Sequence, residues 1–176
     1  MKKRILASLK GSDLRSIGNS AEAVSAILKN PALFSDLVEA MLHNDRLVRM
    51  RAADAVEKVT REHPDWLQPW KRVVLERLST YEDKEFRWHV AQLLPRLKLT
   101  RAEKYRVTEI LTGYLTDKSS IVRTFSMQAL ADIATDDPPL RDQVRPIIER
   151  LTRTGTPAMK SRGRKLLKQL ATNTSQ

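Results

Sequence analysis

One stretch decides the fold that this sequence predicts: Asp45-Arg46-Leu47-Val48-Arg49-Met50-Arg51-Ala52-Ala53-Asp54-Ala55-Val56-Glu57-Lys58-Val59. Its apolar residues recur at the spacing that places side chains on one face of an α-helix: Val48, Ala52, Ala55, Val56 and Val59. Asp45 stands just before that face, and aspartate caps helix N-termini by accepting a hydrogen bond from a free backbone N–H. The stretch therefore predicts an amphipathic helix that begins after Asp45.

The same pattern returns three times further along the chain. Each copy has a capping residue followed three positions later by an apolar residue: Asp83 and Phe86, Ser119 and Val122, Thr156 and Met159. The copies begin 38, 36 and 37 residues apart, and a fainter copy begins at Asp13. At one position of the pattern most copies have a small residue, such as Ala52 and Gly163, which lets a neighbouring helix approach closely.

A second helical segment precedes each of the four clear copies. These segments show apolar periodicity over residues 34–43, 68–78, 101–115 and 140–153, and Thr100 with Glu103 forms a capping box before the third. No stretch alternates with period two long enough to predict a strand. A helix pair of this size buries its apolar face only against its neighbours, so the pairs are expected to stack.

The pattern Asp-x-x-Val-Arg-x-x-Ala-x-x-Ala-Val at residues 45–56 resembles the second helix of a HEAT repeat. Because the pattern recurs, the resemblance covers nearly all of residues 13–170. The resemblance implies an all-α fold, a right-handed α-solenoid of about four to five HEAT-like helix pairs. We expect a single domain over residues 1–170 with a disordered tail at 171–176. The expected repeats are roughly 1–30, 33–60, 66–98, 100–135 and 138–170.

The positive charge is concentrated at the two ends of the sequence. The chain carries a net charge of +11, but residues 31–140 hold 17 basic and 17 acidic side chains. Residues 1–30 carry a net charge of +4, and residues 141–170 carry nine Lys or Arg against Asp142 and Glu149. Such an excess favours an anionic partner: a nucleic acid, an acidic protein surface or an anionic lipid.

Several other classes of site find no support in the sequence. The chain has no cysteine, which excludes disulfides and thiolate metal sites. Its three histidines, His43, His63 and His89, lack metal-ligand spacing and are interpreted as surface or helix-end residues. We expect no cofactor, no metal, no membrane span and no secretion signal, and a cytoplasmic location.

A column of cations recurs at one position of the pattern: Arg49, Arg87, Arg123 and Lys160. Arginine forks match phosphate oxygens, so the column can be read as a binding row. The HEAT resemblance implies instead a ladder of Asp and Arg between repeats, with Asp45 and Asp83 as partners of the first two arginines. The structural interpretation is favoured, and Lys160 is left freer to bind.

The remaining candidate contact residues fall beside this column and on the last helix. Trp88 lies opposite Phe86 and is read either as an exposed anchor or as a residue packed on a neighbouring helix. The last helix combines a free N-terminus with a run of cations that suits phosphate or carboxylate, although a polar terminal repeat needs similar residues for solubility. The full set is Arg49, Arg51, Arg87, Trp88, His89, Arg123, Gln128, Lys160, Arg162, Arg164, Lys165 and Lys168.

Two functions of different class follow. The first is a non-enzymatic HEAT-repeat scaffold or adaptor whose concave face and basic ends bind an acidic protein or a nucleic-acid backbone. The second rests on a resemblance to HEAT-like alkylpurine DNA glycosylases, which use an exposed Trp and a nearby Asp. One turn after Trp88 this chain has Gln92, so that alternative would need Asp54 or Asp132.

Overall fold

The computed structural model describes Leu9 and residues 20–172. This described part is helical apart from short connecting segments, and no strand occurs in it, as the sequence predicts. The fold divides into two compact units, Met1–Leu97 (unit 1) and Lys98–Gln176 (unit 2). The fainter repeat that begins at Asp13 is described only from Ser20 onwards, where Ala23 and Ile27 of its apolar face are buried. Most of the basic N-terminal end lies outside the described residues.

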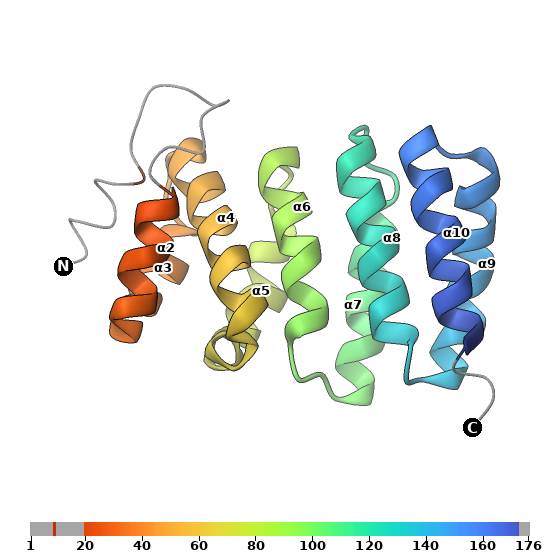
Figure 1. The fold of residues 1–176 in the computed structure, drawn as a ribbon, viewed down its shortest axis with the longest axis horizontal. Helices are drawn as coiled ribbons and strands as arrows, with labels where there is room; N and C mark the ends of the chain where they lie inside the picture. The colour runs from red at the N-terminus through yellow and green to blue at the C-terminus, as the bar shows by residue number, and fades with distance from the viewer. Residues whose placement is uncertain (1–8, 10–19, 173–176) are drawn as a thin grey trace. The chain divides into compact units, whose positions relative to one another are not determined.

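Unit 1 is built from helices that alternate between two layers. Figure 1 shows α2, α4 and α6 side by side, with the shorter α3 and α5 behind them. The pairing is confirmed by packing, since α4 contacts α2, α3 and α6. The described elements are α2 (Ser20–Lys29), η1 (Pro31–Leu33), α3 (Phe34–Ala40), α4 (Arg46–Glu62), η2 (Pro64–Trp70), α5 (Lys71–Glu76), η3 (Leu78–Thr80), α6 (Lys84–Leu93) and η4 (Leu94–Arg96).

Two prolines shape the irregular parts of unit 1. Pro69 lies inside η2, where the missing N–H and fixed φ favour short 3₁₀ turns over a continuous α-helix. Pro95 lies in η4, and the regular part of α6 ends just before it, at Leu93. Proline removes the backbone donor that a further α-helical turn requires. The helical segment predicted at residues 68–78 is therefore split between η2, α5 and η3.

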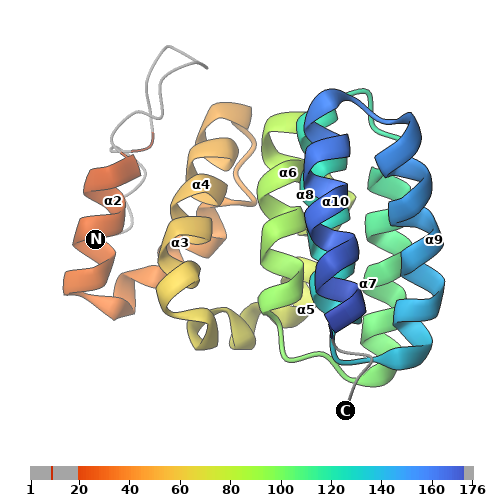
Figure 2. The same cartoon turned by 45° about the vertical axis from the view of Figure 1, so that its right-hand side comes forward.

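Unit 2 holds two longer helix pairs, α7 (Arg101–Tyr114) with α8 (Ser120–Ala134) and α9 (Pro138–Thr154) with α10 (Pro157–Thr172). Helix α8 packs against α7, α9 and α10. In Figure 2, α8 and α10 lie on one side of this unit and α7 and α9 on the other. Helix α10 includes two residues of the stretch that was expected to be a disordered tail, and residues 173–176 lie outside the described part.

The repeating apolar positions form the core of each unit. Val48, Phe86, Val122 and Met159 are all at most 1% exposed, which confirms the pattern on which the fold prediction depends. The small positions Ala52, Ser126 and Gly163 are also buried. Every apolar lead residue of the four clear copies therefore faces a neighbouring helix.

The predicted helix starts are only partly confirmed. Asp45 accepts a hydrogen bond from the Leu47 N–H at 2.8 Å, and Thr156 accepts a longer one from Met159. Thr100 and Glu103 form the predicted capping box. Asp83 and Ser119 precede their helices without capping them through the side chain, so those two predictions are wrong. The carboxylate of Asp83 is instead bound by arginines of α4.

Candidate interaction surface

Arg49 belongs to the internal structure of unit 1 rather than to a binding row. Its guanidinium donates to the carbonyl oxygens of His43 and Asn44 at 2.9 and 2.8 Å, and it pairs with Asp83 at 2.6 Å. It also lies 4.8 Å from the centre of the Tyr81 ring. The ladder interpretation is confirmed here, but the carboxylate comes from the following repeat rather than from Asp45.

Replacing Arg49 with lysine tests this structural role. Lysine keeps the charge but loses the planar fork, so we expect the free energy of unfolding to fall by about 1–2 kcal/mol. The exposed Arg164→Lys serves as the matched control and is expected to leave stability unchanged. Urea denaturation followed by circular dichroism measures both. An Arg49→Lys protein as stable as the control would contradict the ladder.

The ladder does not continue at Arg123. Arg87, the arginine before it in the column, donates from Nε to the Tyr81 carbonyl at 3.1 Å. Arg123 is half-buried, and its Nε is buried without a hydrogen-bond partner. In the following repeat, the residue at the position of Asp83 is Thr156, which has no carboxylate to pair with Arg123. Within the described residues Arg123 has no carboxylate partner, so this cation is positioned by the fold without being neutralised.

Two of the residues expected on the surface are buried, and those predictions are wrong. Arg51 is 2% exposed and its guanidinium donates to the Leu9 carbonyl at 3.0 Å. Its contact lies 42 residues away in sequence, which local periodicity cannot reveal. His89 is 3% exposed, and its Nδ1 has no hydrogen-bond partner. Both residues therefore serve the packing of unit 1.

Burial of His89 has a consequence for stability. Burial lowers the pKa of His89 to about 4, although the nearby Asp54 and Glu57 raise it; Lys58 lowers it further. The unfolded chain therefore binds more protons than the folded chain between pH 4 and the ordinary histidine value of about 6.5. Stability contributed by neutral His89 is complete above that range and is lost as the pH falls through it.

We predict that His89→Leu removes this part of the pH dependence. One proton linked to folding changes the free energy of unfolding by at most about 1.4 kcal/mol per pH unit, and a leucine side chain cannot bind a proton. Urea denaturation at several values between pH 4.5 and 6.5 measures the slope for wild type and variant. Parallel slopes would show that His89 is not the linked group. His43→Leu is the control, because His43 is only half-buried.

Trp88 is neither a fully exposed anchor nor a core residue. Its ring is half-buried and lies tilted against the His89 ring, with 3.6 Å between ring centres. The acids named for the glycosylase alternative are engaged in the fold. Asp54 pairs with Lys58 at 2.7 Å, and Asp132 accepts hydrogen bonds from Gln128 and Gln169.

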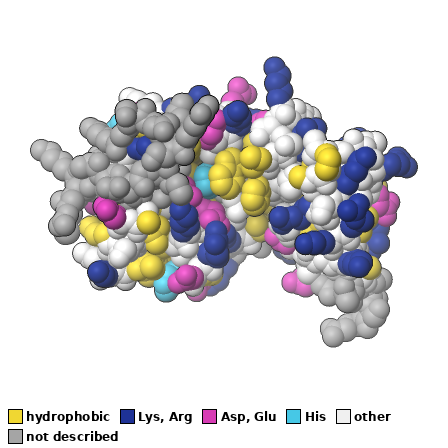
Figure 3. Space-filling view, turned by 45° about the horizontal axis from the view of Figure 1, so that its top comes forward, with side chains coloured by type: hydrophobic (Ala, Val, Ile, Leu, Met, Phe, Trp, Pro, Cys, Tyr) yellow, Lys and Arg dark blue, Asp and Glu magenta, His cyan; other side chains and the backbone are white. Residues whose placement is uncertain are grey.

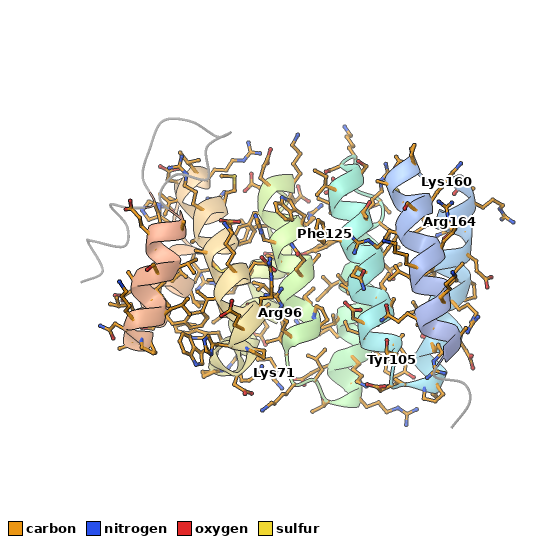
Figure 4. All side chains as sticks on the ribbon, in the orientation of Figure 1. Lys71, Arg96, Tyr105, Phe125, Lys160 and Arg164 are labelled. Atoms are coloured by element: carbon orange, nitrogen blue, oxygen red, sulfur yellow. The ribbon has the colours of Figure 1, made fainter. Side chains whose placement is uncertain are left out.

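The strongest surface feature is on the last helix. Four cations of α10 are exposed and form what we call the α10 cation face: Lys160, Arg164, Lys165 and Lys168. Figure 3 shows Lys and Arg side chains gathered over unit 2, and Figure 4 shows Lys160 and Arg164 on the N-terminal half of α10. No acidic residue occurs in α10. Lys160, Arg164 and Lys165 form no ion pair with any residue that the structure describes.

Contacts within unit 2 hold this face in place. Arg162, on the other side of α10, donates to the Gln128 side chain of α8 at 2.7 Å, and Gln169 donates to Asp132 and Thr135. Arg145 of α9 donates to the Leu170 carbonyl at 3.0 Å. Gln128 and Arg162 were expected to be contact residues, but they bind each other and orient α10. The cation face is thus a fixed surface of a packed helix.

A buried network in unit 1 was missed by sequence reasoning. Glu57 is 4% exposed and binds Arg96 of η4 and Arg61 of its own helix, at 2.5 and 2.7 Å. Figure 4 shows Arg96 reaching the region between α4 and α6. Burial raises the pKa of Glu57, but the hydrogen bonds from Arg96 and Arg61 outweigh it and hold the pKa below its usual range. Of these contacts, only the pair of Glu57 and Arg61 could be expected from the sequence, because the two residues stand four apart on one helix.

Comparison with known proteins now places the chain in a family. Its sequence matches the HEAT repeat domain over residues 2–170. The chain belongs to the HEAT-repeat family. No curated protein sequence matches it. Among solved structures, it is similar to the crystal structure of an engineered protein from the Northeast Structural Genomics Consortium, with a TM-score of 0.66 and 18% identity. The match covers 98% of this chain and 80% of the other, and it supports the fold alone.

Two other kinds of feature, groups of metal ligands and helices that could span a membrane, are absent from the part of this HEAT-repeat chain that the structure describes. Across Leu9 and residues 20–172, no three His, Asp or Glu side chains are grouped as metal ligands. None of the described helices is long and apolar enough to span a bilayer. The α10 cation face is therefore the candidate surface for function.

Proposed function

We propose that this HEAT-repeat chain is a non-enzymatic binding protein whose α10 cation face contacts an anionic partner. One observation carries the proposal. Three exposed cations of one helix, Lys160, Arg164 and Lys165, have no acidic partner among the described residues, whereas many cations of unit 1 are paired. Unpaired cations of one sign attract counter-ions and raise the association rate of anionic partners.

The distribution of charge in the rest of the chain supports the same proposal. Residues 31–140 are balanced, so the excess in the described part lies almost wholly on α9 and α10. A surface that only needed solubility would intersperse both signs. The basic end at residues 1–30 was expected to contribute as well. Of its six cations only Lys29 is described, so that contribution remains a prediction.

Chromatography on immobilised heparin, a polyanion, tests the proposal. In the triple variant Lys160→Gln, Arg164→Gln and Lys165→Gln, we expect elution at a clearly lower NaCl concentration than wild type. The matched control removes three other exposed cations, Lys29→Gln, Arg77→Gln and Arg106→Gln, and so has the same net charge. If both variants elute together, only overall charge matters and the α10 cation face is not the contact surface.

The glycosylase alternative receives less support from the geometry. A general acid or base at Asp54 or Asp132 would have to reach its substrate, but Asp54 is paired with Lys58 and Asp132 is bound by two glutamines. Release of alkylated bases from DNA, compared between wild type and Asp54→Asn, tests this alternative directly. Release by wild type that Asp54→Asn abolishes would favour it over the binding function.

A further inference from the structure

We infer that the α10 cation face binds the phosphate backbone of a nucleic-acid duplex without reading its sequence. This inference rests on the proposed function and names the partner that the surface suits. Three observations distinguish a duplex backbone from an acidic protein and from an unpaired strand: the missing apolar anchor, the spacing of the cations and the absence of aromatic residues.

The α10 face lacks the residues that make protein interfaces tight. Its exposed side chains in the described helix are Pro157, Ala158, Lys160, Ser161, Arg164, Lys165, Lys168 and Ala171. Binding energy between proteins is concentrated in buried aromatic and arginine anchors, and lysine is depleted in such interfaces. Apart from Arg164, this face of lysines and small residues offers no such anchor. It matches a partner whose surface is charged throughout.

The spacing of the cations suits a polyanion with closely spaced charges. Lys160, Arg164 and Lys168 stand four residues apart on one side of α10, so they extend over about 12 Å of helix. A duplex carries one phosphate charge per about 1.7 Å of its axis, so on the order of seven phosphates lie within that length. Each long, flexible cation can therefore reach a phosphate without a fixed register.

The aromatic rings that stack on unpaired bases, and the side chains that read adenine and cytosine edges, are missing from this surface. Helices α9 and α10 contain no Phe, Tyr or Trp on which an unpaired base could stack. The exposed residues of α10 include no Asn, Gln, Asp or Glu to distinguish adenine or cytosine edges. Gln169 is half-buried and donates to Asp132 and Thr135. The face is therefore suited to contacts that position a backbone rather than specify a sequence.

Arg123 adds an independent cation within the same unit. It occupies in α8 the repeat position that Lys160 occupies in α10, and it has no carboxylate partner among the described residues. Of the two arginines at the equivalent position in unit 1, Arg49 is neutralised by Asp83. Where the repeat supplies Thr156 instead of a carboxylate, a phosphate oxygen can take the place of the missing acid.

Fluorescence anisotropy with a labelled duplex of about 20 base pairs tests the inference. We expect wild type to bind two unrelated sequences with similar affinity, and binding to weaken steeply with KCl. The triple variant Lys160→Gln, Arg164→Gln and Lys165→Gln should bind at least about tenfold more weakly at about 100 mM KCl. Its slope of log K against log salt should be shallower by about three, because each phosphate contact contributes about 0.9.

The control variant Lys29→Gln, Arg77→Gln and Arg106→Gln should keep the wild-type slope. Equal losses in both triple variants would overturn the inference, because the contacts would then not lie on α10. Parallel titrations use poly-glutamate, an unpaired strand of the same length and vesicles with phosphatidylserine. Suppose that wild type binds one of these probes but not the duplex, and that only the α10 variant loses this binding. The duplex inference is then overturned and the proposed function stands. If wild type binds no anionic probe, both fail.

Discussion

Replacing Arg96 with methionine is expected to lower the free energy of unfolding by about 3–5 kcal/mol at pH 7, because it leaves the buried carboxylate of Glu57 without its main partner. Arg96 also donates to the Glu57 carbonyl and the Thr60 hydroxyl, at 2.5 and 2.8 Å. Arg61, the other partner of Glu57, is 65% exposed and stabilises the charge less. Urea denaturation at pH 7 measures the loss.

The pH dependence of that loss identifies its cause. In wild type the pKa of Glu57 lies below its usual range, so its stabilising effect is present above the unfolded value of about 4.5 and is lost as the pH falls through the folded value. The difference between wild type and Arg96→Met should therefore shrink below that pH, where Glu57 is protonated. The double variant Glu57→Gln with Arg96→Met should be more stable than Arg96→Met at pH 7. Arg72→Met removes an exposed pair with Glu76 and should leave the urea midpoint unchanged.

Gly163→Ala is expected to destabilise the protein by about 2–3 kcal/mol, because a methyl group there would overlap α9. The added Cβ would lie 1.9 Å from the Thr152 hydroxyl oxygen and 3.0 Å from its Cβ. Rotation of Thr152 removes only the first clash, so α10 must move away from α9. Thermal unfolding measures the loss, and Thr152→Ala in the same protein should restore part of it.

Gly113→Ala is the matched control for Gly163→Ala. Gly113 also lies in a helix, α7, but an added Cβ there meets no atom within 4 Å. Alanine favours the helix over glycine by up to about 1 kcal/mol, so this variant should be neutral or more stable than wild type. If Gly163→Ala lowers stability while Gly113→Ala does not, the loss at Gly163 is due to packing and not to helix propensity. A Gly163→Ala protein as stable as Gly113→Ala would contradict the close approach of the two helices.

The sequence was sufficient for the fold because the fold depends on local periodicity. Val48, Phe86, Val122 and Met159 were predicted to be buried from spacing alone, and all four are. The small position at Gly163 was also predicted, and the structure confirms the contact with α9 that requires it. To predict such features, it is enough to know which residues share one face of a helix and that another helix packs against that face.

Polar side chains were predicted less well because their partners are distant in sequence. Asp83 was expected to cap its own helix, but the guanidinium groups of Arg46 and Arg49 lie close enough to bind it instead. Arg51 was expected on the surface because charged residues are rarely buried, and the Leu9 carbonyl that satisfies it could not be identified. The α10 cation face was predicted correctly as an exposed feature, since a run of cations without acids has no local means of neutralisation.

The pairing of Arg49 with Asp83 makes the order of the repeats matter. Because the acid that neutralises Arg49 comes from the next helix pair along the chain, its neutralisation depends on which repeat follows it. A repeat moved in front of one that starts with threonine, as at Thr156, would acquire an uncompensated cation without any change to its own residues. Shuffling or deleting internal repeats would thus create or erase basic patches even where every hydrophobic contact is preserved.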